Sequence, residues 1–249
     1  MDFVPIKKRT LSDKVREHLY EYIKNMDLNS STKLPAEDLI AQNLGVSRIT
    51  IRKALTDLET NGIVFRVHGK GTFVNPEALQ LKVNITNGFE VRQMIEDSGY
   101  KADVEVLYVG YEPCNIEVAK NLKINEGDEI VKVEKLFYAD GKPAVFCIDR
   151  FPKSKVDEYI TKEDMRGCIF KYMLQKTGKI VTWDKSSIYC ATKESLLSLS
   201  KNISKLQNDA LLVFNVKNYE QQNNIVLYNT EIYDTNFINF NVIRQKKII

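Results

Sequence analysis

The feature that most constrains the fold is a pair of helix patterns with almost nothing between them. The first covers LPAEDLIAQNLG at residues 34–45, and Gly45 ends it. The second covers SRITIRKALTDLETNG at residues 47–62, with Ser47 as its predicted N-cap and Gly62 after its last turn. Because a single residue separates the two patterns, the helices must meet at a sharp turn, which predicts a helix-turn-helix.

The second of these helices has an apolar face and a basic face. Successive residues are rotated by about 100°, so the apolar residues share one stripe, which must be buried. Arg48 and Arg52 are four residues apart and project side by side from the N-terminal half, where a recognition helix meets base edges. The buried stripe is Ile51, Ala54, Leu55 and Leu58, and the opposite arc is Arg48, Ile49, Arg52, Lys53 and Thr56.

A glycine-containing hairpin follows the helices. The runs IVFRV at 63–67 and TFVN at 72–75 are β-prone and are separated by HGKG. With another amphipathic helix at 11–26, this order predicts a winged helix-turn-helix. The tip resembles a nucleotide phosphate site in composition, but a P-loop needs Lys directly before Ser or Thr, and here Gly71 follows Lys70. The hairpin therefore suits the phosphates of a nucleic-acid backbone.

The rest of the chain mixes strand and helix patterns. Tight turns at ADGK and QQNN join neighbouring strands, which predicts a largely antiparallel sheet with helices packed on it. The whole chain is therefore predicted to be an α+β protein. Helices are expected at 88–99, 115–122, 169–178 and 192–200, and strands at 102–110, 129–139, 142–151, 179–191, 210–220 and 225–234.

Composition narrows the function classes. The four cysteines form no CxxC pair and there are only two histidines, so neither a disulfide framework nor a zinc site is expected. Neither histidine lies near a GxSxG motif, so no catalytic residue is predicted. No apolar run approaches the roughly 20 residues of a membrane span, which predicts a cytoplasmic protein without a membrane partner.

Positive charge is concentrated near the N-terminus. Residues 1–76 hold 12 Lys and Arg against 9 Asp and Glu, whereas the rest of the chain holds 24 of each kind. The formal net charge of +3 therefore comes from the segment with the helix-turn-helix pattern. This placement is consistent with nucleic-acid contact.

The run at 33–74 resembles the DNA-binding domain of the GntR family of bacterial transcription regulators, because GVSR, T.R.AL..LE..G and GKGTFV stand at the family's spacing. The remainder resembles the UTRA ligand-binding domain of the HutC-type branch, through FYADGKP and the ending NNIVLYNTEIYDTNFINFNV. The resemblance implies a chorismate-lyase-like fold for that part. It also implies a DNA-binding domain at 1–75, a linker at 76–84 and an effector-binding and dimerisation domain at 85–249.

The resemblance further implies which residues contact DNA. Arg48 and Arg52 fall on the family's recognition-helix arginines, and His68 and Gly69 fall on the wing tip that enters the minor groove. Asp38 stands where the family usually has Arg, which predicts a lost contact or an altered operator base, because a carboxylate cannot hold a phosphate. The full predicted set is Ser47, Arg48, Thr50, Arg52, Lys53, His68, Gly69 and Lys70.

The positions that bind effector in the family depart further. Lys135 and Phe137 replace an Arg-x-Arg pair, which argues against a phosphosugar because the guanidinium fork is lost. Backbone amides near Asn87 leave a small acid or a nucleotide-like effector open. The predicted effector contacts are Thr86, Asn87, Gly88, Lys135, Phe137, Cys147, Cys168, Phe170, Glu231 and Tyr233.

The sequence therefore predicts a homodimeric transcription regulator, of the repressor kind most frequent in this family. Its partners are expected to be double-stranded operator DNA and a small-molecule effector that changes the spacing of the two DNA-binding heads. No cofactor and no metal are predicted. Two alternatives stay open: a lyase-like enzyme, since fold does not settle function, and a DNA-binding protein that does not respond to small molecules.

Overall fold

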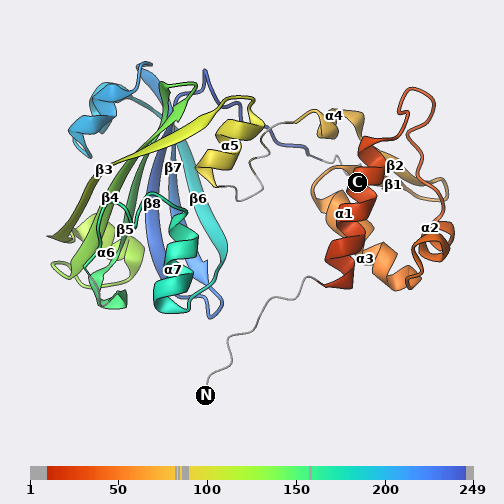
Figure 1. The fold of residues 1–249 in the computed structure, drawn as a ribbon, viewed down its shortest axis with the longest axis horizontal. Coiled ribbons are helices and arrows are strands. Elements are labelled where there is room, and N and C mark those ends of the chain that lie inside the picture. The colour runs from red at the N-terminus through yellow and green to blue at the C-terminus, as the bar shows by residue number, and fades with distance from the viewer. Residues whose placement is uncertain (1–9, 82, 84, 86–89, 157–158, 245–249) are drawn as a thin grey trace. The chain divides into compact units, whose positions relative to one another are not determined.

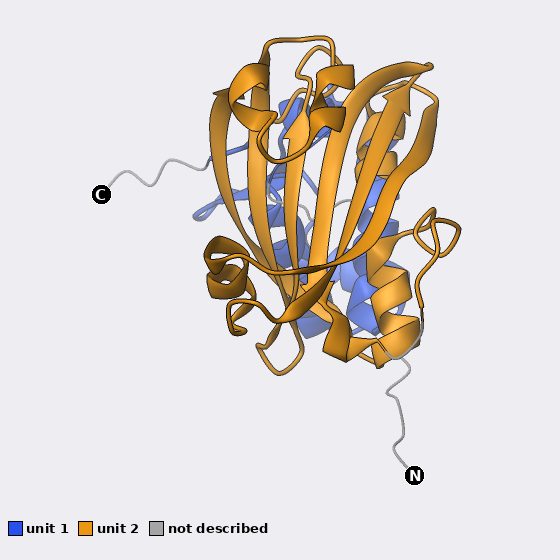
Figure 2. Cartoon of the chain, turned by 90° about the vertical axis from the view of Figure 1, so that its left-hand side faces the viewer, with its two compact units in different colours: residues 1–86, 241–249 blue, residues 87–240 orange. Residues whose placement is uncertain are grey.

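The computed structural model describes residues 10–81, 83, 85, 90–156 and 159–244. The chain forms two compact units, shown in different colours in Figure 2. The first unit is Met1–Thr86 together with Asn241–Ile249, and the second is Asn87–Phe240. Within the described ranges, no helix is long and apolar enough to cross a bilayer.

The first unit combines three helices with a two-stranded hairpin (Figure 1). The helices are α1 (Leu11–Lys24), α2 (Glu37–Leu44) and α3 (Arg48–Thr60), and a one-turn helix α4 (Pro76–Leu79) follows the hairpin. The hairpin strands β1 (Val64–Val67) and β2 (Gly71–Val74) pair antiparallel. This order confirms the predicted winged helix-turn-helix.

Local sequence fixes the helix boundaries of this unit. At the start of α1, the Thr10 hydroxyl accepts the Asp13 amide N–H at 3.2 Å, and the Asp13 carboxylate accepts the Thr10 N–H at 2.9 Å. This capping box satisfies two amide groups that have no partner within the helix. Helix α2 ends at Gly45, whose φ of 63° is left-handed and strains no side chain. The resulting turn lets α3 begin at Arg48.

The core of the first unit is centred on the apolar stripe of α3. Its four predicted residues are all at most 3% exposed. They pack against α1, α2 and the hairpin through Val15, Leu19, Ile23, Ile40, Val64 and Val74. The predicted stripe is confirmed, and its burial leaves the opposite arc of α3 facing outward.

The second unit is built on a six-stranded antiparallel sheet with the order β3-β4-β5-β8-β7-β6. The predicted strands and their antiparallel pairing are confirmed. In the ADGK turn, Asp140 and Gly141 have φ values of 49° and 76°, as a tight two-residue hairpin loop requires. The strands are β3 (Ala102–Pro113), β4 (Glu129–Ala139), β5 (Lys142–Pro152), β6 (Val181–Thr192), β7 (Ala210–Glu220) and β8 (Ile225–Tyr233).

Helices cover both faces of this sheet. Helices α5 (Val91–Asp97) and α7 (Ile169–Thr177) lie on one face, where apolar residues of α7 pack on β4 and β5. The opposite face is covered at one end by α6 (Ile116–Leu122). At its other end lie α8 (Lys193–Leu196) and the 3-10 helix η2 (Lys201–Lys205). A short 3-10 helix, η1 (Lys153–Lys155), follows β5.

The end of the chain returns to the first unit. The Ile85 N–H donates to the Asn241 carbonyl at 2.8 Å, and the Asn241 N–H donates to the Val83 carbonyl at 3.0 Å. The side chain of Ile243 lies against Gly62, where a Cβ atom would be only 2.8 Å from it. The boundaries of these compact units differ from the predicted domains at 1–75 and 85–249 with a linker at 76–84. That domain division remains a prediction.

Candidate DNA-binding surface and ligand pocket

The N-terminal turn of α3 is held by Ser47. Its hydroxyl accepts the Thr50 amide N–H at 3.2 Å and lies 2.8 Å from the Thr50 hydroxyl. This cap satisfies an amide that has no partner within the helix and fixes the direction in which α3 begins. Ser47 and Thr50 are therefore occupied with each other, and both lie at the end of α3 where the predicted base contacts are.

Arg48 makes two ion pairs with α2. Its Nε lies 3.3 Å from a Glu37 carboxylate oxygen, and one of its terminal nitrogens lies 3.2 Å from the Asp38 carboxylate. Both Arg48 and Asp38 remain well exposed, at 58% and 71% of their side chains. Asp38, which stands where the family usually has Arg, thus lies beside Arg48 and neutralises part of its charge.

Arg52 and Lys53 both face solvent on the outer arc of α3. Within the described part of the chain, the Arg52 guanidinium has neither an ion pair nor a hydrogen bond. Next to them, Arg66 of β1 braces the hairpin against α3: one terminal nitrogen lies 2.5 Å from Glu59, and the other donates to the Arg52 carbonyl at 3.3 Å. The brace orients the hairpin relative to the helix that carries the unpaired arginine.

The hairpin tip consists of His68, Gly69 and Lys70, all exposed. Gly69 has a φ of 72°, and the Lys70 N–H donates to the Val67 carbonyl at 3.0 Å, so the turn is closed by its own backbone. A Cβ at Gly69 would meet nothing within 4 Å. The tip therefore projects freely, as a wing that enters a DNA groove must.

Ile49 was not among the predicted contacts, although it lies on the same arc. Its side chain is 81% exposed, the highest value among the large apolar residues of the described chain. An apolar side chain at the exposed start of a recognition helix suits the methyl group of thymine. The signal was present in the sequence, since an isoleucine on the polar arc of an amphipathic helix has no core to join.

Six of the ten predicted effector contacts line one small pocket between the sheet and the helices α5 and α7. These six are Lys135, Phe137, Cys147, Cys168, Phe170 and Glu231. The pocket has a volume of about 40 Å³, close to that of one or two water molecules, so this closed state of the pocket is too small for a sugar-sized ligand. Thr86, Asn87 and Gly88 lie outside the described residues.

A buried ion pair forms the floor of this pocket. The Lys135 ammonium lies 3.3 Å from the Asp149 carboxylate, and both side chains are 4% exposed. Asp149 also accepts a hydrogen bond from Asn229, whose own oxygen accepts one from Asn218 at 2.5 Å. Asp149 and Asn229 were not predicted as site residues, because their place beside Lys135 and Glu231 depends on the pairing of β4, β5 and β8.

Glu231 adds a further acidic group to the pocket, which Glu90 also lines. Burial raises the pKa of Glu231 to about 7, although the Tyr233 hydroxyl donates a 2.6 Å hydrogen bond to it. Burial also raises the pKa of the Cys147 thiol well above its usual range, which keeps this cysteine neutral and unreactive. Tyr233 is fully buried behind Glu231 and supports it from within the core.

Comparison with known families agrees with the geometry. Residues 11–74 match the model described as "Bacterial regulatory proteins, gntR family", and residues 97–238 match the UTRA domain. The chain belongs to the GntR family and carries a UTRA domain. Its N-terminal part is thus of the DNA-binding type, and its C-terminal part is of the ligand-binding type.

Individual relatives are regulators of the same kind. The chain is 30% identical over 145 residues to YurK, an uncharacterized HTH-type transcriptional regulator of Bacillus subtilis, covering 58% of this chain and 56% of YurK. It is 23% identical over 239 residues to MngR, the mannosyl-D-glycerate transport/metabolism system repressor of Escherichia coli, covering 96% of each chain. These names describe transcription regulators and not enzymes, which removes the lyase alternative.

Solved structures share the fold. The crystal structure of YydK, a possible transcriptional regulator from Bacillus subtilis, superposes with a TM-score of 0.72, covering 94% of this chain and 99% of that one at 19% identity. PhnF from Mycobacterium smegmatis superposes with a TM-score of 0.55 over 94% of this chain and 100% of its own, also at 19% identity.

Among the described residues of this chain, no cluster of metal-binding side chains is present.

Proposed function

We propose that this GntR-family protein is a homodimeric, cytoplasmic repressor that binds a palindromic operator and is released by a small-molecule effector. Each subunit would place the N-terminal half of α3 in a major groove and the hairpin tip in the adjacent minor groove. The repressor role is supported by MngR, which is named as a repressor and resembles this chain over 96% of its length.

The observation that carries the proposal is the unpaired guanidinium of Arg52. It is exposed on α3 and lies beside a helix start and a hairpin that both face outward. A bidentate contact from arginine to guanine is the commonest specific contact in the major groove. Ile49 would read a neighbouring thymine methyl group, while Lys53 and Lys70 would hold phosphates.

The effector would bind where the closed pocket lies. The pocket holds one lysine, already neutralised by Asp149, and two further carboxyl groups, those of Glu90 and Glu231. Three acidic groups against one cation disfavour a phosphate dianion, so the effector is expected to be uncharged or cationic and rich in hydroxyl groups. Because the pocket is closed, the effector must favour an open state, and its effect on DNA affinity cannot exceed its preference for that state.

Replacing Arg52 by alanine tests the function. Arg52→Ala is expected to weaken operator binding by about 1–3 kcal/mol, which is roughly fivefold to 150-fold, while non-specific DNA binding falls far less. Affinity for operator and for scrambled DNA would be measured by mobility shift at one salt concentration, since salt changes both.

A control variant separates base reading from general charge loss. Arg166→Ala removes an exposed arginine from the second unit, where the side chain is 64% exposed and forms an ion pair with Glu163 at 3.5 Å. Operator affinity should be unchanged in this variant. Equal affinities of Arg52→Ala and the wild type for the operator would refute the proposed reading of DNA.

A further inference from the structure

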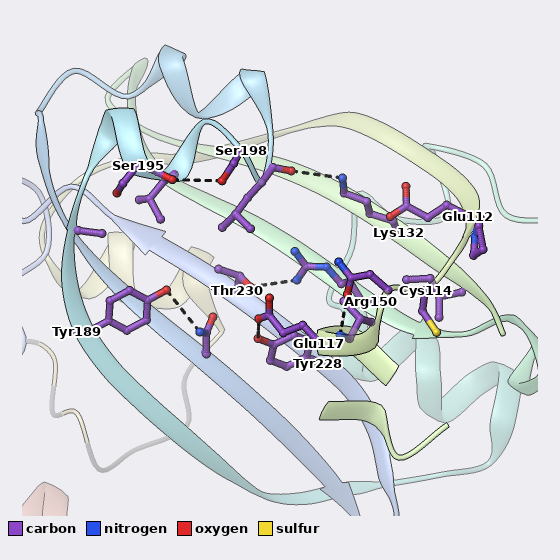
Figure 3. Close-up of a pocket in the computed structure, with 18 residues that line it drawn as sticks. Glu112, Cys114, Glu117, Lys132, Arg150, Tyr189, Ser195, Ser198, Tyr228 and Thr230 are labelled. Carbon is purple, nitrogen blue, oxygen red and sulfur yellow. Dashed lines mark hydrogen bonds between the residues drawn. The ribbon is translucent and has the colours of Figure 1, made fainter. Parts of the chain in front are cut away.

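A second and much larger cavity lies on the opposite face of the sheet from the pocket described above. It has a volume of about 460 Å³ and lies between α6, α8 and the strands β4, β5 and β8 (Figure 3). Its size falls within the roughly 300–1,000 Å³ of sites for small organic molecules. Neighbouring residues of a strand point to opposite faces, so Asp149 belongs to the closed pocket and Arg150 to this cavity.

Arg150 is the central cation of this cavity. It is 6% exposed and lines the cavity together with residues from several helices and strands. In Figure 3 its guanidinium points toward Thr230, and one terminal nitrogen donates to the Thr230 hydroxyl at 3.0 Å. The same nitrogen lies 3.4 Å from the Ile148 carbonyl, and the guanidinium lies 5.5 Å from the centre of the Tyr228 ring.

These neutral contacts leave the charge of Arg150 without an ion pair among the described residues. A guanidinium has five N–H donors, and only one of its nitrogens is engaged. Its other two nitrogens have no hydrogen-bond partner among the described residues, and they are not fully buried. A molecule in the cavity can therefore reach them. Burial lowers the pKa of Arg150, which shows that this charge is held against a cost of desolvation.

The remaining charges of the cavity limit what can bind. Lys132 is already paired with Glu134 at 3.2 Å and donates to the Leu199 carbonyl. Glu117 accepts a long hydrogen bond of 3.4 Å from the Tyr228 hydroxyl, and Glu112 also lines the wall. The Glu112 and Glu117 carboxylates lie near enough to act on Arg150, so a dianion would bring two further negative charges to one cation that has no ion pair in the described part of the chain, whereas a monocarboxylate brings only one.

The rest of the wall is polar without being charged. Ser195, Ser198 and Asn215 face the cavity together with Thr230. Hydroxyl and amide groups of this kind form hydrogen bonds with the hydroxyl groups of a ligand. Glu112 and Glu117 can accept hydrogen bonds from further hydroxyl groups.

We propose that this cavity binds a hydroxylated monocarboxylate of the size of a sugar acid, with its carboxylate on the Arg150 guanidinium beside Thr230. The site is separate from the effector pocket and does not depend on the proposed repressor role. Arginine suits this task because its planar fork matches a carboxylate with two parallel hydrogen bonds.

Gluconate is the probe, with glucitol as an uncharged match and glucitol 6-phosphate as a dianion. Isothermal titration of the full chain should show saturable gluconate binding and none by either match at the same millimolar concentrations. Arg150→Met keeps most of the side-chain length and removes the charge. This change should weaken gluconate binding at least tenfold, as expected for a lost charged hydrogen-bond pair.

Three further variants make the result decisive. Thr230→Val keeps the shape of the side chain but removes the hydroxyl that accepts a hydrogen bond from Arg150. It should weaken gluconate binding, and it tests the site even if Arg150→Met does not fold. Glu231→Gln changes the closed pocket and Arg166→Met removes an exposed arginine, and both should bind gluconate like the wild type. The melting temperature of Arg150→Met without ligand should be equal to or above that of the wild type, because an unpaired buried charge is removed.

Several results would overturn the site. These are absence of saturable gluconate binding, equal binding of glucitol, tighter binding of glucitol 6-phosphate, or binding that both Arg150→Met and Thr230→Val leave intact. Loss of gluconate binding in Glu231→Gln would instead place the acid in the closed pocket. Operator binding by Arg52→Ala is a separate measurement, so failure of the repressor proposal and failure of this site are distinguishable.

Discussion

Asp38 determines how much of the charge of Arg48 is available to DNA. The two side chains lie 3.2 Å apart and are both exposed, so the pair itself contributes little to stability. Its effect on binding is larger than its effect on folding, since a phosphate approaching Arg48 meets the Asp38 carboxylate as well. Asp38, which stands where the family usually has Arg, thus affects the DNA contact of Arg48 as well as the contact at its own position.

Asp38→Asn is expected to strengthen DNA binding. The amide cannot neutralise Arg48 or repel phosphate, so affinity should rise by about 1 kcal/mol or less, and the slope of affinity against salt concentration should become steeper. Titrations at several salt concentrations would measure both quantities. Glu77→Gln, at an exposed position of α4, is the matched control. An unchanged salt slope in Asp38→Asn would contradict the role given to this residue.

Glu231 makes stability depend on pH in an unusual direction. Its pKa in the folded protein, about 7, is above its ordinary value of 4.5 because the carboxyl is desolvated. Between these two values the folded state binds more protons than the unfolded state. The free energy of unfolding therefore falls as pH rises through this range and stays reduced above pH 7.

Glu231→Gln removes this dependence while keeping an oxygen that can accept from Tyr233. The variant should melt at a higher temperature than the wild type at about pH 8, and the difference should nearly vanish at about pH 5. Melting curves by circular dichroism would measure it. Glu163→Gln, with a side chain 80% exposed, should show no such pattern. A difference between Glu231→Gln and wild type that is the same at both pH values would argue against a raised pKa.

At the scale of elements, helices and strands could be predicted from the sequence because their periods are local. The stripe of α3 from Ile51 to Leu58, the cap at Ser47 and the ADGK hairpin depend only on neighbouring residues. The ion pair of Lys135 with Asp149 could not be predicted, because it depends on the register of β4 against β5, which shifts between Phe137 and Tyr138.

The cavity of Arg150 could not be predicted from the sequence for a similar reason. Its walls come from helices and strands that are far apart in the chain, from Glu112 to Thr230. Periodicity places Arg150 among apolar residues of a strand, but it does not show that no carboxylate reaches the guanidinium. A pattern reports which face a side chain occupies, whereas the unpaired charge depends on every element packed against that face.

Strand β6 forms an open edge of the sheet. Ten of its twelve residues are exposed, including Trp183, Ile188 and Tyr189, and its outer side has no partner strand in the described sheet. A long edge with exposed apolar side chains is a template for pairing with another chain. In the proposed homodimer, the same edge on both subunits can pair antiparallel about a two-fold axis.

Ile188→Lys tests this interface. A charge on each copy at the centre of the edge should weaken the dimer at least tenfold, because like charges meet across a two-fold axis. Sedimentation at several protein concentrations would give the dissociation constant. Leu174→Lys, at an exposed apolar position of α7, should leave the dimer intact. Dimers of equal strength in both variants would assign the interface to another surface.

At the scale of the whole molecule, charge and ligand chemistry are divided between the two units. The excess of basic residues lies in residues 1–76, and both the closed pocket and the Arg150 cavity lie in the second unit. The two pockets share strands β4, β5 and β8 and open on opposite faces of one sheet.

The returning C-terminal segment gives the second unit two covalent attachments to the first. The chain leaves the first unit after Thr86 and re-enters it at Asn241, where backbone hydrogen bonds tie it to Val83 and Ile85. The unit that holds the pockets is thus inserted into the chain of the first unit and is connected to it at both of its ends. Only residues 234–240 separate the end of β8 at Tyr233 from the segment that rejoins the first unit at Asn241.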